Sequence, residues 1–149
     1  MQDAHTPETL AAAGWVPSHE PGLSDTLGGP LWSRPDEGLT DGLPCFGFRT
    51  APHHANGHGM VHGGVLLTVI DHSLGMFVRA ATGGQGGVTM QLDTQFVGAV
   101  TPGAFVVLHG RLVRAARSVV FVQGRLLAGT QEAASASGIW KLRRATPAG

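Results

Sequence analysis

The sequence has little charge and almost no cysteine. Ten Lys and Arg residues balance ten Asp and Glu residues among 149, and charged residues make up only 13% of the chain. A protein that grips the phosphates of a nucleic acid or an anionic membrane carries a basic patch, so we expect neither partner. The single cysteine, Cys45, cannot form an internal disulfide, and no charged segment followed by an apolar one opens the chain. These features predict a cytoplasmic protein.

Long uninterrupted apolar runs and several common catalytic motifs are also missing. The most apolar stretch, residues 65–81, is interrupted by Asp71 and Arg79, so we expect no membrane span. No G-x-S-x-G motif is present, and Cys45 has no neighbour in sequence that would activate it. The glycine-rich segment 83–87 lacks the Lys and Ser or Thr of a phosphate-binding loop. We therefore expect neither acyl-enzyme chemistry at a serine or cysteine nor a nucleotide site at this segment.

The length and composition indicate one domain preceded by an arm. A chain of 149 residues is long enough to bury a core and too short for a separate cofactor domain. Residues 1–44 are rich in Gly, Pro, Ser and acidic residues and predict a partly irregular N-terminal arm. A short helix is expected at Pro7, with the preceding threonine as its N-cap and with Trp15 and Trp32 as anchors. Residues 45–149 are expected to form the folded domain.

A single long helix dominates the middle of the chain. Before it, residues 46–50 alternate in the manner of a strand. The helix begins near His62 and Gly63, runs to Ala81, and is followed by glycines that favour a C-terminal stop. Because the helix is apolar on nearly every side, we expect the rest of the domain to surround it.

Four extended segments follow the helix and define the fold class. They cover residues 88–97, 104–113, 118–127 and 132–142. The short connections between them favour an antiparallel meander. One early strand, one buried helix and four further strands predict an α+β fold in which a curved sheet surrounds a central helix.

Asp71 is the most informative residue of the helix. A carboxylate within an apolar helix is unfavourable unless it is paired, hydrogen-bonded or protonated. One reading is that Asp71 caps a neighbouring loop or pairs with Arg79 two turns later. The other is that it performs chemistry.

The two glycines that begin the helix form a second candidate feature. The first turn of a helix has unpaired N–H groups, and the absence of side chains at Gly63 and Gly64 lets a ligand oxygen approach these groups closely. Alternatively, the two glycines only allow the loop to turn into the helix. A carbonyl that becomes an oxyanion needs such donors. Gly63 and Asp71 are separated by about 12 Å of helical rise, so they cannot both contact one carbonyl within a chain. If both are catalytic, the site lies at a symmetric dimer interface.

Four histidines gather in the loop before the helix, at positions 53, 54, 58 and 62. Such a cluster raises the question of a metal ion. No second group of Cys, His or carboxylate residues with ligand spacing accompanies them, and a glycine-rich loop holds ligands poorly. We expect no metal.

Residues 56–71, NGHGMVHGGVLLTVID, resemble the signature of hotdog-fold acyl-CoA thioesterases of the phenylacetic-acid-degradation (PaaI-like) type. The resemblance continues through residues 87–96, the turn at 101–103 and residues 134–140, and covers roughly residues 28–143. It implies a dimer-forming hotdog fold, a homodimer or a homotetramer built of two dimers, that hydrolyses an acyl-CoA thioester to free acid and CoA. It implies no cofactor beyond the CoA of the substrate. A non-catalytic ligand-binding protein and a dehydratase of the same fold are the alternatives.

The resemblance also implies roles for individual residues. Asp71 acts as a general base on water or attacks the thioester directly, and the Gly63 N–H polarises the thioester carbonyl. Asn56 and His62 shape that end of the site, by binding near the leaving sulfur or by orienting the loop. Thr89 helps to hold the water beside Asp71.

Residues that bind the substrate are expected around the same helix. Gly64 lies beside the carbonyl, and Leu67 and Leu74, together with Met76, contact the acyl group. The CoA phosphates meet Arg114 and Arg117 at a strand turn, unless these two arginines are ordinary solvated charges.

Overall fold

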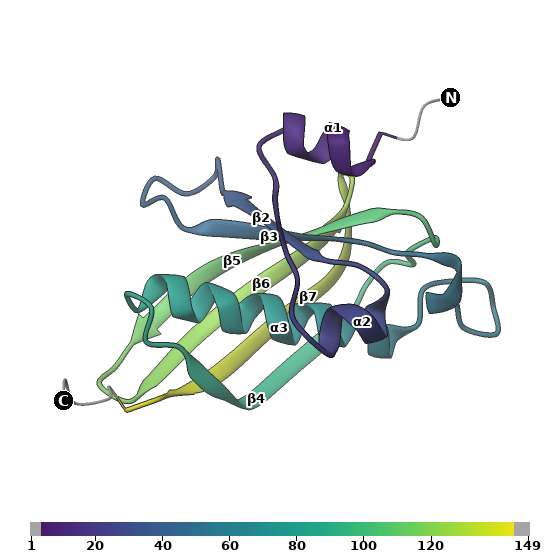
Figure 1. Ribbon diagram of the computed structural model, residues 1–149. Coiled ribbons are helices and arrows are strands. Elements are labelled where there is room, and N and C mark those ends of the chain that lie inside the picture. The colour runs from purple at the N-terminus through teal and green to yellow at the C-terminus, as the bar shows by residue number, and fades with distance from the viewer. Residues whose placement is uncertain (1–3, 145–149) are drawn as a thin grey trace.

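A long helix, α3 (Gly63–Ala81), lies across one face of a seven-stranded antiparallel sheet (Figure 1). The computed structural model describes residues 4–144. The strands are β1 (Val16–Ser18), β2 (Leu31–Pro35), β3 (Pro44–Arg49), β4 (Gly87–Phe96), β5 (Phe105–Ala115), β6 (Val119–Ala128) and β7 (Gln131–Leu142). The shorter helices are α1 (Pro7–Ala12), α2 (Leu23–Leu27) and the 3-10 turn η1 (Pro52–His54). The predicted α+β fold, a curved antiparallel sheet around one long helix, is confirmed.

The helix α3 buries one face against the sheet. Its sheet-facing side chains, which include Ile70, Leu74 and Phe77, are completely buried in the main core. Nearer the start of the helix, Leu67 is 38% exposed in the single chain. By length and composition α3 could cross a membrane, with a mean hydropathy of 1.3, contrary to expectation. A helix that is packed in a protein core meets the same criteria of length and composition. The apolar face of α3 is packed in this way, against the sheet.

The strands follow a meander only in part. The sheet order is β1-β2-β3-β5-β6-β7-β4, so β5, β6 and β7 are consecutive neighbours as predicted. The prediction is wrong for β4, which pairs with β7 at one edge of the sheet. The segment between β4 and β5 passes the start of α3, where the Val61 N–H donates to the Val100 carbonyl at 2.8 Å. This crossing carries the chain past the helix to the middle of the sheet.

The N-terminal arm is more regular than its composition indicates. The predicted helix is present as α1, and Thr6 caps it by accepting a hydrogen bond from the Thr9 N–H. Within the arm, β1 and β2 extend the sheet through the pairing of β2 with β3. Trp15 and Trp32 anchor the arm by packing in a second, smaller core with Phe105.

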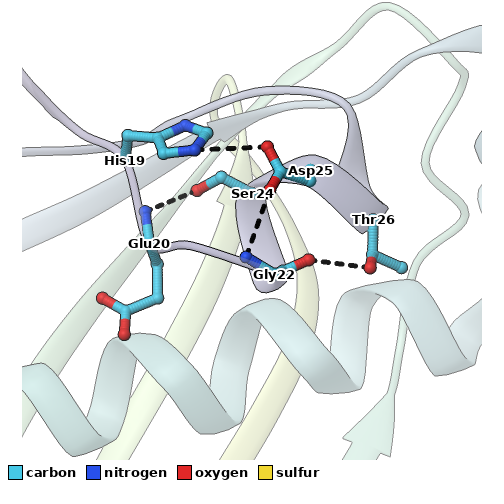
Figure 2. A network of polar contacts seen from close by, with 6 residues as sticks. All are labelled: His19, Glu20, Gly22, Ser24, Asp25 and Thr26. Carbon is cyan, nitrogen blue, oxygen red and sulfur yellow. Dashed lines mark hydrogen bonds and ion pairs between the residues drawn. The ribbon is translucent and has the colours of Figure 1, made fainter.

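The helix α2 is held by a local polar network and by one buried leucine. Figure 2 shows the Gly22 N–H donating to the Asp25 carboxylate at 3.2 Å and the Glu20 N–H donating to the Ser24 hydroxyl at 2.8 Å. Leu27, at the end of α2, is buried in the same core as the sheet-facing residues of α3. The arm is therefore part of the fold that positions α3.

Candidate active site

Asp71 lies in the middle of α3, half-buried, and faces the edge strand β4. The Thr89 hydroxyl donates a hydrogen bond to Asp71 Oδ1 at 2.7 Å. Arg79 lies near the same cavity, but among residues 4–144 no ion pair joins it to Asp71. The partner of Asp71 is thus a strand hydroxyl rather than the arginine or a loop amide.

A β-bulge gives Thr89 its orientation. The register of β4 against β7 shifts between Thr89 and Gln91, which leaves Met90 outside the regular ladder. Bulges re-aim side chains and are frequent beside active sites. Here the bulge coincides with the one residue of β4 that bonds to Asp71.

A cavity of about 280 Å³ opens beside Asp71 and Thr89. Two cationic side chains, Arg79 and Arg143, contribute to its wall, as does the ring of the buried Trp140. Of these three, only Arg79 is named from the sequence, as a possible partner of Asp71. Arg143 and Trp140 come from the far end of the chain and carry no local signal.

The start of α3 presents one free backbone donor. The Gly64 N–H donates to His62 Nδ1 at 3.0 Å, and the next two N–H groups bond to the His62 carbonyl at 3.0 and 3.2 Å. Within the described part of the chain, the Gly63 N–H alone in this first turn has no acceptor. A helix N-terminus with an unpaired N–H stabilises developing negative charge. His62 therefore acts as the N-cap, which leaves Gly63 available.

The loop before α3 is ordered by Asn56. Its Oδ1 accepts hydrogen bonds from the His58 N–H at 2.9 Å and from the Met60 N–H at 3.2 Å. Of the two roles predicted for Asn56, this geometry favours orientation of the loop that leads to His62.

The loop histidines do not converge on a common point. The rings of His53 and His54 both approach the Leu27 carbonyl, at 3.1 and 2.7 Å, while His58 is exposed and His62 caps α3. Burial lowers the pKa of His54, an effect partly offset by its bond to Leu27. Two of the four rings thus fasten the loop to α2.

The residues predicted to bind the substrate are scattered. Leu67 is 38% exposed, but Leu74, two turns later on nearly the same side of α3, is completely buried against Gly124 of β6. The prediction that Leu74 contacts the acyl group is therefore corrected, because its side chain is part of the core. Arg114 and Arg117 are exposed at the end of β5 and in the turn that follows, and neither lines the Asp71 cavity. Met76, by contrast, does line it.

Gly63 and Asp71 lie toward opposite ends of β4. A Cβ placed on Gly63 would lie 3.5 Å from the ring of Phe96, at the C-terminal end of the strand. Asp71 bonds to Thr89, near the N-terminal end. Within one chain the donor and the carboxylate are thus held apart, as the helical rise predicts.

Similarity to known proteins agrees with this arrangement. Residues 58–135 match the family model of the thioesterase superfamily. A Pseudomonas aeruginosa protein named "Putative esterase PA0474" is 35% identical over 92 residues, which cover 60% of this chain and 67% of that protein. The E. coli PaaI protein from the phenylacetic acid degradation operon has a TM-score of 0.71 at 16% identity, over 83% of this chain and 86% of its own. Protein smu.793 of Streptococcus mutans, solved with bound acetyl CoA, has a TM-score of 0.62 at 22% identity, over 66% of this chain and 79% of its own.

The antiparallel sheet, the single long helix and the structural match to PaaI define a hotdog-fold protein. The family match spans just over half of the chain and includes His62, Gly63, Asp71 and Thr89. The chain belongs to the thioesterase superfamily, whose general chemistry is the hydrolysis of thioesters.

Proposed function

We propose that this protein hydrolyses acyl-CoA thioesters to a free acid and CoA, at a site that two copies of the chain share. The observation that carries the proposal is the Asp71 carboxylate, which is held by Thr89 at 2.7 Å and opens into a cavity. A positioned carboxylate beside a solvent-accessible space is what activation of a water molecule requires.

The hydrolysis follows from the two features of α3. Thr89 occupies Asp71 Oδ1, which leaves Oδ2 to accept a proton from water as the water oxygen bonds to the thioester carbon. The carbonyl oxygen becomes an oxyanion and accepts a hydrogen bond from the Gly63 N–H. When the carbon–sulfur bond breaks, the proton held by Asp71 passes to the sulfur, and the products are the acid and free CoA. Direct attack by Asp71 would instead form an anhydride that water then opens.

The exposed edge of β4 supports a second copy of this chain as the partner that completes the site. Beyond its pairing with β7, β4 has a free edge, and its exposed apolar residues include Val88, Met90 and Phe96, each at least 50% exposed. A free edge with apolar side chains is a template for another strand, and a two-fold axis makes identical edge strands antiparallel.

Antiparallel pairing of two β4 strands would also complete the site. Gly63 lies beside the Phe96 end of β4 and Asp71 beside the Thr89 end. In a two-fold dimer the Phe96 end of one strand lies next to the Thr89 end of the other. The donor of one chain would then face the carboxylate of its partner.

The charges of the Asp71 cavity suit CoA. Arg79 and Arg143 can each make charge-assisted hydrogen bonds to phosphate oxygens, and the similar Streptococcus mutans structure contains acetyl CoA. Arg114 and Arg117 remain predicted contacts for the CoA phosphates. No cofactor enters this mechanism.

The test is free-thiol release from a panel of aryl and straight-chain acyl-CoA esters. We expect the wild-type protein to release thiol, the Asp71→Asn variant to lose nearly all of this activity, and the Asp93→Asn variant to keep it. Asp93 is a matched control because it is an exposed carboxylate on β4 that bonds only to Gln91 among the described residues. A folded, dimeric protein that releases no thiol from any ester would favour a ligand-binding protein and refute the proposal.

A further inference from the structure

A second cavity lies on the face of the sheet opposite α3. Its volume is about 510 Å³, and it shares no lining residue with the Asp71 cavity. A Cβ placed on Gly110 of β5 would lie 2.6 Å from the Phe77 ring of α3, so Gly110 faces the helix. Side chains alternate along a strand, and the neighbouring His109 therefore points away from α3 into this cavity.

Three side chains that can bind a metal meet at the cavity wall. Asp36 follows β2, Cys45 is on β3 and His109 is on β5. One potential ligand atom from each residue lies within 4.8 Å of the other two. The pairing of Phe46 with Leu108 explains the convergence, because the residues next to that pair on the opposite face are Cys45 and His109.

Asp36 and Cys45 are buried, which distinguishes this cluster from surface carboxylates. Asp36 is 6% exposed and Cys45 is 2% exposed. Asp36 Oδ1 accepts the Gly38 N–H at 3.0 Å, and Oδ2 lies 2.8 Å from His109 Nδ1. The carboxylate is therefore fixed on one side and directed at the imidazole on the other.

We propose that Asp36, Cys45 and His109 bind one zinc-class divalent cation, through a carboxylate oxygen, the thiolate sulfur and an imidazole nitrogen. Thiolate, imidazole and carboxylate together are the ligand set that zinc prefers, and three protein ligands leave the fourth tetrahedral position open. All three residues line the cavity. Ligand atoms around tetrahedral zinc lie about 3.5 Å apart, so a side-chain movement of roughly 1 Å closes the site.

The surroundings of Cys45 favour a metal ligand over a nucleophile. Cys45 is only 2% exposed. A reactive cysteine is accessible to its substrate, and Cys45 is not. A bound cation replaces the thiol proton and balances the two negative charges of Asp36 and Cys45. The sequence predicts no metal site. The three proposed ligands come from separate segments of the chain, so their proximity is not visible in the sequence.

Titration of the metal-free, tag-free full-length protein with Co²⁺ tests the proposal. Because Cys45 is the single cysteine, a thiolate-to-cobalt charge-transfer band in the near ultraviolet identifies it as a ligand in the wild-type protein itself. We expect this band to saturate at one Co²⁺ per chain and Zn²⁺ to displace the cobalt. A folded wild-type protein that binds no Co²⁺, or that binds it without the band, overturns the proposal.

Variants then assign the other two ligands. Cys45→Ser should abolish the band, and Asp36→Asn and His109→Gln should each weaken Co²⁺ binding by at least about 100-fold. His58→Gln is the control, because His58 is exposed in the loop before α3, and it should bind like the wild type. Unchanged affinity in the Asp36 and His109 variants, or a loss in the His58 variant, would contradict the assignment.

Discussion

The hydrogen bond from Thr89 to Asp71 gives the most specific prediction about the chemistry. Thr89→Val keeps the shape of the side chain and removes the donor that holds Asp71 Oδ1 at 2.7 Å. A hydrogen bond to a charged group contributes about 1.5–3 kcal/mol, which corresponds to about 10- to 150-fold in rate at 1.4 kcal/mol per tenfold. Because Asp71 and Thr89 are only partly buried, solvent screens the interaction. We expect a decrease near the lower limit, about tenfold in kcat/KM.

The assay is thiol release from the best acyl-CoA ester of the panel, with two controls on the same strand. Thr89→Ser keeps the hydroxyl and should keep most of the activity. Thr94→Val makes the same chemical change at a buried β4 hydroxyl that has no hydrogen-bond partner among residues 4–144, so its activity should be unchanged. Equal activity in Thr89→Val and Thr94→Val would refute the reasoning that Thr89 positions Asp71.

Three further predictions follow from the same structure. Gly63→Pro removes the free N–H at a helical position that tolerates proline, and it should lower kcat about 100-fold. Gly63→Ala keeps the N–H and should lower kcat only slightly. Equal effects of the two substitutions would contradict the role of the Gly63 N–H as a donor. Met90→Lys places a charge on the free edge of β4, where Met90 is 60% exposed, and light scattering should show monomers with little thiol release; an active monomer would contradict the shared site. Burial lowers the pKa of His54 below its usual value of 6.5, so below pH 6.5 the unfolded chain binds more protons than the folded chain. The midpoint of urea-induced unfolding should therefore move to lower urea concentration as the pH falls from 6.5 through the pKa of His54 in the folded chain. His54→Gln should abolish that component of the pH dependence, and a wild-type midpoint that does not change in this range would contradict it.

The sequence predicts the local elements well because their signals are local. Helix α3 begins after a capping residue and ends before Gly83 and Gly84, both of which have positive φ, and a strong apolar pattern fills the interval. The strands β5 to β7 alternate and are separated by turn residues. Glycine, proline and capping residues act over a few positions, so their effects are visible in the sequence.

What the sequence does not reveal is how distant segments meet. The pairing of β4 with β7 depends on the path of the chain around α3, and the orientation of Thr89 depends on a bulge in that pairing. The burial of Leu74 depends on which face of an almost wholly apolar helix turns to the sheet. Arg143 reaches the Asp71 cavity from the other end of the chain. Each of these facts is set by tertiary packing, which overrides local pattern.

The claim that two chains share each site is tested most directly by mixing two inactive variants. Asp71→Asn and Gly63→Pro are unfolded together, refolded together and assayed for thiol release. If Gly63 of one chain works with Asp71 of its partner, each mixed dimer contains one intact site. Random pairing makes half of the dimers mixed, so about a quarter of the wild-type activity should return. If both residues served a site within one chain, every site in the mixture would carry a defect and no activity would return, which would contradict the account.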